Sequence, residues 1–204
     1  MCHFRRDSSK GLTVVVQSGA GHVLLALGAN LPGRWGDPLT ALRRVVVELA
    51  NAGLRLMAAS HIYATTPLGP GRQAPYLNAV LMLESHLAPA ALLRLLKGLE
   101  RRAGRRFAPR WGPRCLDIDV LDYSGRRVGR PSRRRERGRL VLPHPELHSR
   151  AFVLVPLLEI APHWRHPVLG VAGRTLLVRI DPRKRAGVLQ TLDSAAPACD
   201  KKAT

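Results

Sequence analysis

Apolar residues recur along the chain with two periods, which predicts strands interleaved with helices. A short apolar run at residues 23–28 predicts a buried strand. Asp37 then stands in an N-cap position before Pro38, and apolar residues repeat at helical spacing until Gly53, which predicts a helix. The same two patterns predict strands at 54–63, 76–83 and 116–121, a short strand at 140–142, and helices at 89–104, 151–160 and around 176–180.

The order of these elements is typical of a ferredoxin-like fold. Up to residue 121 the order is strand, helix, strand, strand, helix, strand, which forms an antiparallel sheet with two helices packed on one face. We therefore expect an α+β, ferredoxin-like protein with a mainly antiparallel sheet and helices packed on it. Such a fold assigns no activity by itself.

Length and composition indicate one domain with an extension at each end. The chain has 204 residues, of which 46% are hydrophobic, enough for one full core. Residues 1–21 are polar and Gly-rich, and residues 184–204 are basic and then small and polar. We expect an N-terminal extension and a C-terminal tail around a domain at 22–183. Inside that domain, an arginine-rich loop at 124–139 is expected to lie in solvent.

The chain is strongly basic, with a formal net charge of +19 and a sequence pI near 11.5. Such a charge raises nucleic-acid binding as a hypothesis. The arginines are clustered, however, with six between Arg101 and Arg114 and eight between Arg126 and Arg139. The first cluster adjoins two acidic residues, as expected for a polyphosphate site, and an aromatic content of 4% leaves few rings to stack on bases. Composition therefore does not favour specific nucleic-acid binding.

Cysteine usage and hydropathy favour a cytoplasmic protein. The three cysteines are far apart, which supports neither a disulfide framework nor a Cys-based zinc site. No apolar run reaches the length of a membrane span, and the first residues do not form a convincing signal peptide. We expect a soluble, cytoplasmic monomer with no membrane partner.

Two aspartates in an apolar run carry the strongest chemical signal. Asp117 and Asp119 are two positions apart, so on a strand both side chains leave the same face, about 6.6 Å apart. Proteins commonly hold Mg²⁺ with one or two carboxylates, together with oxygens of the substrate phosphates. Arg110 and Arg114 stand just upstream, and guanidinium groups fit phosphate oxygens. A solvated edge strand is the plainer alternative, but the rigid Trp-Gly-Pro-Arg turn before the aspartates favours a metal site for phosphate chemistry.

Five segments together resemble one enzyme family. They are ALGANL at 26–31, YATTPLGPGRQAPYLNAV at 63–80, LERRAGR at 99–105, RWGPRCLDIDVL at 110–121 and LPHPELHSRAFVLVPLLEIAP at 142–162. In this order and spacing they resemble the 6-hydroxymethyl-7,8-dihydropterin pyrophosphokinases of folate biosynthesis. The resemblance implies transfer of the β,γ-pyrophosphoryl unit of ATP to the hydroxymethyl oxygen of the pterin. It also implies release of AMP and two Mg²⁺ ions between the substrates.

The resemblance implies roles for individual residues. Asp117 and Asp119 match the metal-binding pair, and Arg105 and Arg114 match the catalytic arginines that handle the phosphates. Asn30 matches a position near the pocket floor. The positions that match ATP contacts are Glu100, Arg139, His144 and Arg150. The positions that match pterin contacts are Tyr76 and Phe152, which would stack on the ring, Asn78, which would read its hydrogen-bonding edge, and the backbone groups of Thr65 and Leu68.

Some of these residues have plainer alternatives, and two positions depart from the family pattern. Tyr76 and Phe152 could be ordinary core aromatics, and His144, between two prolines, could shape a turn. Phe107 stands where the family often has a second arginine, and the neighbouring Arg106 is a candidate substitute, so we expect weaker or rearranged phosphate handling. Lys97 stands where a glutamine is frequent.

Three alternative functions remain open at this point. The chain could be a nucleic-acid-binding protein on the same sheet, or a protein that has kept the fold and lost the activity. It could also be a nucleoside triphosphatase or another phosphotransferase, which would share the metal pair but would not need the pterin residues. No residue stands out as a general base, so we expect metal ions and positioning to carry the reaction.

Overall fold

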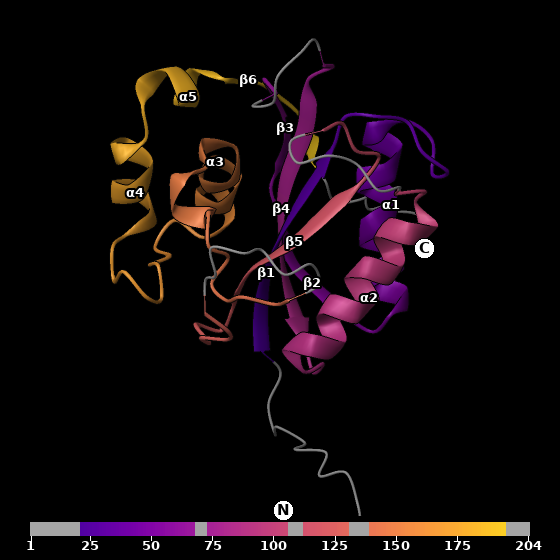
Figure 1. Ribbon diagram of the computed structural model, residues 1–204, viewed down its shortest axis with the longest axis horizontal. Helices are drawn as coiled ribbons and strands as arrows, with labels where there is room; N and C mark the ends of the chain where they lie inside the picture. Colours follow the sequence, from indigo (N-terminus) through magenta and orange to yellow (C-terminus); the bar gives the residue numbers. More distant parts are fainter. Residues whose placement is uncertain (1–20, 68–72, 106–111, 131–138, 195–204) are drawn as a thin grey trace, which may run out of the picture.

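The computed structural model describes residues 21–67, 73–105, 112–130 and 139–194 (Figure 1). The strands in this part of the chain are β1 (Gly21–Ala29), β2 (Arg55–Ala59), β3 (His61–Thr65), β4 (Tyr76–Ser85), β5 (Asp117–Tyr123) and β6 (Val188–Ser194). The helices are α1 (Pro38–Asn51), α2 (Pro89–Arg102), the 3-10 turn η1 (Leu147–Ser149), α3 (Ala151–Ile160), α4 (Gly173–Arg179) and α5 (Pro182–Ala186).

The strands form one antiparallel sheet in the order β5-β1-β4-β3-β6, with β2 also paired to β4. If β2 and β3 are taken together as one strand, this is the expected ferredoxin-like order. The α+β fold is therefore confirmed. Strand β5, which carries the two aspartates, lies at one edge of the sheet.

Alternating side chains divide the core between the two faces of the sheet. Val23, Leu25 and Leu27 of β1 pack in the same buried cluster as the apolar residues of α1 and α2. Leu24, between them, packs with residues of α3 on the other face. Figure 1 shows α1 and α2 on one side of the sheet and α3 on the other. The apolar segment at 151–160 is thus a core helix, as expected.

The first two long helices follow the predicted signals. Asp37 caps α1, since its carboxylate accepts hydrogen bonds from the Thr40 backbone N (3.0 Å) and hydroxyl (2.7 Å). Proline occupies the first turn of both helices. After α2, Gly104 adopts a φ of 96°, a backbone conformation that suits glycine at a helix end.

Two predicted strands differ from the structure. The strand expected at 54–63 is divided into β2 and β3 at the buried Ser60, whose backbone N donates to the Val80 carbonyl while its hydroxyl accepts from the Val80 N. The side chain replaces part of the strand ladder at that point. At 140–142 there is only an isolated bridge between Val128 and Leu142, because the next residue, Pro143, has no N–H with which to extend pairing.

The expectation of a tail from residue 184 is wrong for its first part. Residues 182–186 form α5, and β6 then pairs with β3, whose outer edge would otherwise present unpaired backbone groups. The expected helix around 176–180 is present as α4. Residues 1–20, 131–138 and 195–204 lie outside the described residues. Across the described ranges, no helix is both long and apolar enough to cross a bilayer.

Candidate active site

The two aspartates lie on the same face of β5, as their spacing predicts. In the register with β1, Asp117 is opposite Gly28 and Asp119 is opposite Ala26, and Ala26 packs in the α3-side cluster. The intervening Ile118 points to the opposite core. Their cross-strand neighbours are small, and the side chains of Asp117 and Asp119 are 17% and 35% exposed.

Two arginines converge on Asp117. Arg105 Nη1 lies 2.5 Å from Asp117 Oδ1, and Arg114 Nη1 donates to Asp117 Oδ2. Burial alone would raise the pKa of Asp117, but the two guanidinium groups outweigh it and hold the pKa below its ordinary value. Asp117 is therefore ionised at neutral pH. Both predicted catalytic arginines thus contact a predicted metal ligand.

Glu100 lies beneath this pair, on the last turn of α2, with a side chain only 3% exposed. Its Oε1 accepts hydrogen bonds from the Ile118 backbone N (2.8 Å) and Lys97 Nζ (2.7 Å), and it also pairs with Arg105 Nη1. Burial raises the pKa of Glu100, against the opposing effect of Lys97 and Arg105. The Glu100 carboxylate thus faces β5 and contacts both Lys97 and Arg105.

His144 lies on the other side of the aspartate pair. Its Nε2 is 3.8 Å from Asp119 Oδ2, while its Nδ1 accepts a hydrogen bond from the Glu146 backbone N at 3.2 Å. In the neutral ring this assigns the proton to Nε2, the nitrogen that faces the aspartate. The backbone N of His144 donates to the Leu121 carbonyl, so β5 also holds the histidine in place. Hydrogen bonds to Leu121 and Glu146 therefore help to position His144, in addition to the two flanking prolines.

The other predicted ATP contacts lie close to His144 in the chain. Arg150, the residue just before α3, pairs with Glu146, and its guanidinium carbon lies 5.6 Å from the centre of the Phe152 ring. Arg139 is exposed at the start of the segment that leads to His144. Arg139, His144 and Arg150 thus lie in the segment between the end of β5 and the start of α3.

The predicted pterin residues lie on the neighbouring strands. Asn78 on β4 is opposite Gly28 on β1, so Asn78, Gly28 and Asp117 occupy consecutive positions across three strands. Asn78 is 7% exposed, and its Nδ2 donates to the Thr65 hydroxyl at 2.7 Å. Thr65 is in turn the register partner of Tyr76. The amide, the aspartates and the arginines therefore share one end of the sheet.

The two predicted stacking residues come from different elements. Tyr76 begins β4, and its hydroxyl donates to the Gly112 carbonyl at 2.8 Å. Phe152 lies in the first turn of α3 and is partly buried against the cluster formed by α3 and the sheet. Leu68 lies outside the described residues.

Two residues have more definite contacts than the sequence indicated. Asn30 Oδ1 accepts from the Arg114 backbone N (2.8 Å) and its Nδ2 donates to the Ala74 carbonyl (3.2 Å), which ties the end of β1 to the segments before β4 and β5. Lys97 contacts Glu100 three positions later on α2, a spacing at which helical side chains meet. That spacing was a local signal that could have identified the pair.

The carboxylate pair fits a cation that completes its coordination elsewhere. Among the described residues, no three His, Cys, Asp or Glu side chains gather closely enough to hold a metal by themselves. Mg²⁺ usually takes only one or two protein carboxylates and completes its shell with water and substrate phosphates. Asp117 and Asp119 match that donor set.

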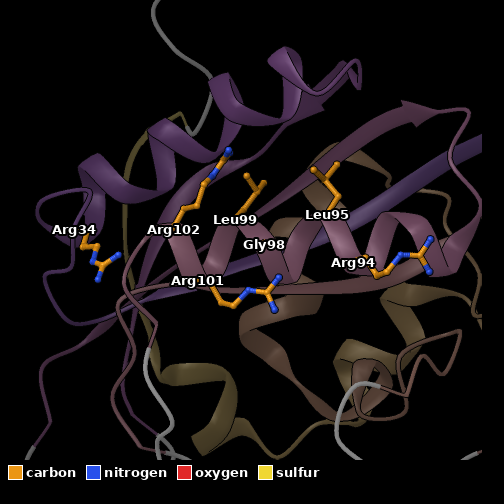
Figure 2. A pocket seen from close by; sticks show the side chains of 7 residues that line it. All are labelled: Arg34, Arg94, Leu95, Gly98, Leu99, Arg101 and Arg102. Carbon is orange, nitrogen blue, oxygen red and sulfur yellow. The ribbon is translucent and has the colours of Figure 1, made fainter.

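A groove of about 490 Å³ lies elsewhere, on the outer face of α2 (Figure 2). Its lining residues are Arg34, Arg94, Leu95, Gly98, Leu99, Arg101 and Arg102. Positions 94, 98 and 101 share one face of the helix, whereas Lys97 and Glu100 turn to β5. The groove is therefore separate from the aspartate site.

Comparison with known proteins gives one family. Residues 24–162 match the family model described as 7,8-dihydro-6-hydroxymethylpterin-pyrophosphokinase. The chain is 41% identical over 162 residues to 2-amino-4-hydroxy-6-hydroxymethyldihydropteridine pyrophosphokinase of Methylorubrum extorquens, covering 78% of this chain and 92% of the relative. It is 36% identical over 159 residues to the protein of the same name from Synechocystis sp., covering 78% and 75%.

The fold is also similar to solved structures. The crystal structure of wild-type Plasmodium falciparum HPPK-DHPS aligns with a TM-score of 0.58 over 83% of this chain, at 12% identity. The chain spans 47% of that longer protein. At this identity the likeness concerns the fold alone.

Proposed function

The chain belongs to the 7,8-dihydro-6-hydroxymethylpterin-pyrophosphokinase family, and we propose that it transfers pyrophosphate from ATP to the hydroxymethyl group of 6-hydroxymethyl-7,8-dihydropterin at the edge strand β5. It is an ATP-dependent diphosphotransferase of folate biosynthesis. The observation that supports this location is the convergence of Arg105 and Arg114 on Asp117, with Asp119 beside it.

In the proposed reaction, the hydroxymethyl oxygen of the pterin attacks the β-phosphorus of ATP. The bond between the β-phosphorus and the oxygen that bridges to the α-phosphorus breaks, AMP leaves, and the hydroxyl proton passes to solvent. The depressed pKa of Asp117 makes it a poor proton acceptor. Positioning and charge stabilisation are therefore the main contributions of the protein.

Asp117 and Asp119 would hold Mg²⁺ together with the phosphate oxygens, and we propose two ions. When bound, Mg²⁺ neutralises the triphosphate and favours the in-line arrangement of attacking and leaving oxygens. Ionised carboxylates are needed for this, and Asp117 is kept ionised by its arginines. The exposure of Asp119 leaves its oxygens accessible from the α3 side.

Arg105 and Arg114 would bind the phosphoryl oxygens as charge grows on them. The contacts of Arg105 to acids use Nη1, and a guanidinium group carries further donors on Nε and Nη2. Arg105 can thus remain anchored while it donates to phosphate. Glu100 supports Arg105 from below, and His144, Arg139 and Arg150 would complete the nucleotide site.

The dihydropterin would lie between Tyr76 and Phe152, with its polar edge at Asn78. Because Thr65 holds the Asn78 amide by its nitrogen, the orientation of the Asn78 carbonyl is set before a ligand binds. Backbone groups of Thr65 and Leu68 would contact the same edge. An analogue without that hydrogen-bonding pattern would leave a buried amide unpaired.

The test is AMP release from ATP and Mg²⁺, with and without 6-hydroxymethyl-7,8-dihydropterin. We expect pterin-dependent AMP that is lost in Asp117→Ala and in Asp119→Ala. Glu84→Gln is a matched control, since Glu84 is an acid on the far part of β4 that pairs with Arg55. ADP formed without pterin would instead indicate a triphosphatase or another phosphotransferase, and no nucleotide product would indicate a lapsed enzyme.

Two further properties concern the location and the assembly of the protein. We propose that the enzyme acts as a cytoplasmic monomer on ATP and the dihydropterin. The cysteine pattern is typical of a reducing compartment, and a net charge of +19 opposes self-association. The molar mass from light scattering, measured with both substrates and Mg²⁺ present, would test the monomeric state. The mass of a dimer would contradict it.

A further inference from the structure

The outer edge of β5 is covered by two side chains of α2. Strand β5 pairs only with β1 among the described strands, so the Ile118 backbone faces outward between the two aspartates. Glu100 Oε1 accepts from its N at 2.8 Å, and Lys97 Nζ lies 3.5 Å from its carbonyl oxygen. Glu100 and Lys97 together therefore take the place of a neighbouring strand at the residue that separates the metal ligands.

One atom, Glu100 Oε1, contacts two cationic side chains, those of Lys97 and Arg105. Lys97 Nζ lies 2.7 Å from it, and Arg105 Nη1 also contacts it. The Glu100 side chain is 3% exposed, so its charge depends on these partners rather than on water. Arg105 Nη1 is shared further, because it also lies 2.5 Å from Asp117 Oδ1.

The position of Arg105 depends on how these charges are divided. With Lys97 present, three cations (Lys97, Arg105 and Arg114) contact two acids, Glu100 and Asp117. Without the lysine, Arg105 would be the only cation in contact with the buried Glu100. Its guanidinium would then be drawn toward Glu100 and away from Asp117.

We propose that Lys97 is a positioning residue for pyrophosphoryl transfer, because its ammonium shares the charge of Glu100 and keeps Arg105 placed between Glu100 and Asp117. The proposal rests on the proposed function of the aspartate site. The Lys97 side chain is 35% exposed, and its removal would leave Arg105 paired with the buried Glu100. Its effect is expected on the reaction, through Arg105.

The first test is the kinetics of Lys97→Met, which keeps most of the side-chain length and removes the charge. We expect kcat to fall about tenfold, the size of one charge-assisted hydrogen bond, while the Kd for the dihydropterin changes less than about twofold. Lys97→Arg should recover most of the rate. Arg94→Met is the matched control, because it removes one exposed cation from the groove face of α2 (Figure 2).

The second test is a double-mutant cycle with Glu100→Gln. A neutral side chain at position 100 needs no counter-charge, so Lys97→Met should change kcat less than about twofold in that background. A merely structural role of Lys97 would give the same loss in both backgrounds. An equal loss in both backgrounds, or no rescue by Lys97→Arg in a folded protein, would overturn the proposal.

An NMR measurement separates this proposal from the function itself. In protein labelled with ¹⁵N-arginine, the Nε–Hε signal of Arg105 should shift in Lys97→Met and should stay unchanged in Arg94→Met. An unchanged Arg105 signal in a folded Lys97→Met protein would refute the positioning role. If the wild type released no pterin-dependent AMP, the proposed function would be wrong. The NMR result would still show whether Lys97 positions Arg105. If Lys97→Met did not fold, Lys97→Gln would take its place in all three measurements.

Discussion

The hydroxyl of Tyr76 donates a hydrogen bond of 2.8 Å to the carbonyl oxygen of Gly112. Tyr76 begins β4, and Gly112 lies two residues before Arg114, so the bond joins the proposed pterin side of the site to its phosphate side. Burial raises the pKa of Tyr76, which keeps the hydroxyl protonated as a donor at neutral pH. The same residue would therefore stack on one substrate and fix the segment that handles the other.

Tyr76→Phe should separate these two roles. The ring remains, so the Kd for the dihydropterin should change less than about threefold. Loss of one neutral hydrogen bond, worth about 1 kcal/mol, should loosen the segment before Arg114 and lower kcat about fivefold. Tyr76→Leu should weaken pterin binding about tenfold or more, since it removes the stacking face. Equal pterin affinity in both variants, measured by calorimetry, would show that Tyr76 does not stack on the substrate.

The two aspartates should differ in their effect on stability. Asp119→Asn removes a proposed metal ligand, so activity should fall about 100-fold or more with little change in the free energy of unfolding. Asp117→Asn should lower activity as well and should also destabilise the fold by about 2 kcal/mol, because Arg105 and Arg114 lose their shared carboxylate. Urea unfolding of both variants checks this difference. A similar loss of stability in the two would contradict the assigned contacts.

The contribution of Asp117 to stability should depend on pH in a defined direction. Its pKa is depressed in the folded protein, so its stabilising effect is fully present above the ordinary aspartate pKa of about 4 and is lost as the pH falls through the folded value. The difference in unfolding free energy between wild type and Asp117→Asn should thus be constant near pH 7 and shrink below about pH 4. A difference that grew in acid would mean that the folded pKa is raised instead.

Local patterns in the sequence predicted the elements that depend on neighbouring residues. The caps at Asp37 and Pro38 and the helical spacing of apolar residues identified α1, and the spacing of Asp117 and Asp119 identified their common face. These features depend on residues a few positions apart, which a single sequence displays directly.

Features that depend on distant segments were not predictable in the same way. The break at Ser60 depends on hydrogen bonds to Val80, and β6 forms because β3 offers an open edge. The family resemblance predicted an ATP contact for Glu100. Only the fold shows that its carboxylate accepts a hydrogen bond from the Ile118 backbone. Likewise, the row of Asn78, Gly28 and Asp117 is a matter of register between strands, which no local pattern encodes.

That row makes Gly28 a sensitive position. A Cβ at residue 28 would lie 3.2 Å from Asn78 Oδ1, a close contact, and the Asn78 amide cannot easily retreat because its Nδ2 is bound to the Thr65 hydroxyl. Gly28→Ala should therefore weaken dihydropterin binding about tenfold, while the free energy of unfolding changes by less than about 1 kcal/mol. The matched control is Gly98→Ala, where a Cβ meets nothing within 4 Å on the surface of α2. That variant should bind pterin normally and gain about 0.5–1 kcal/mol from helix propensity. Calorimetric titration of both proteins with the dihydropterin is the measurement, and wild-type affinity in Gly28→Ala would place the pterin away from Asn78.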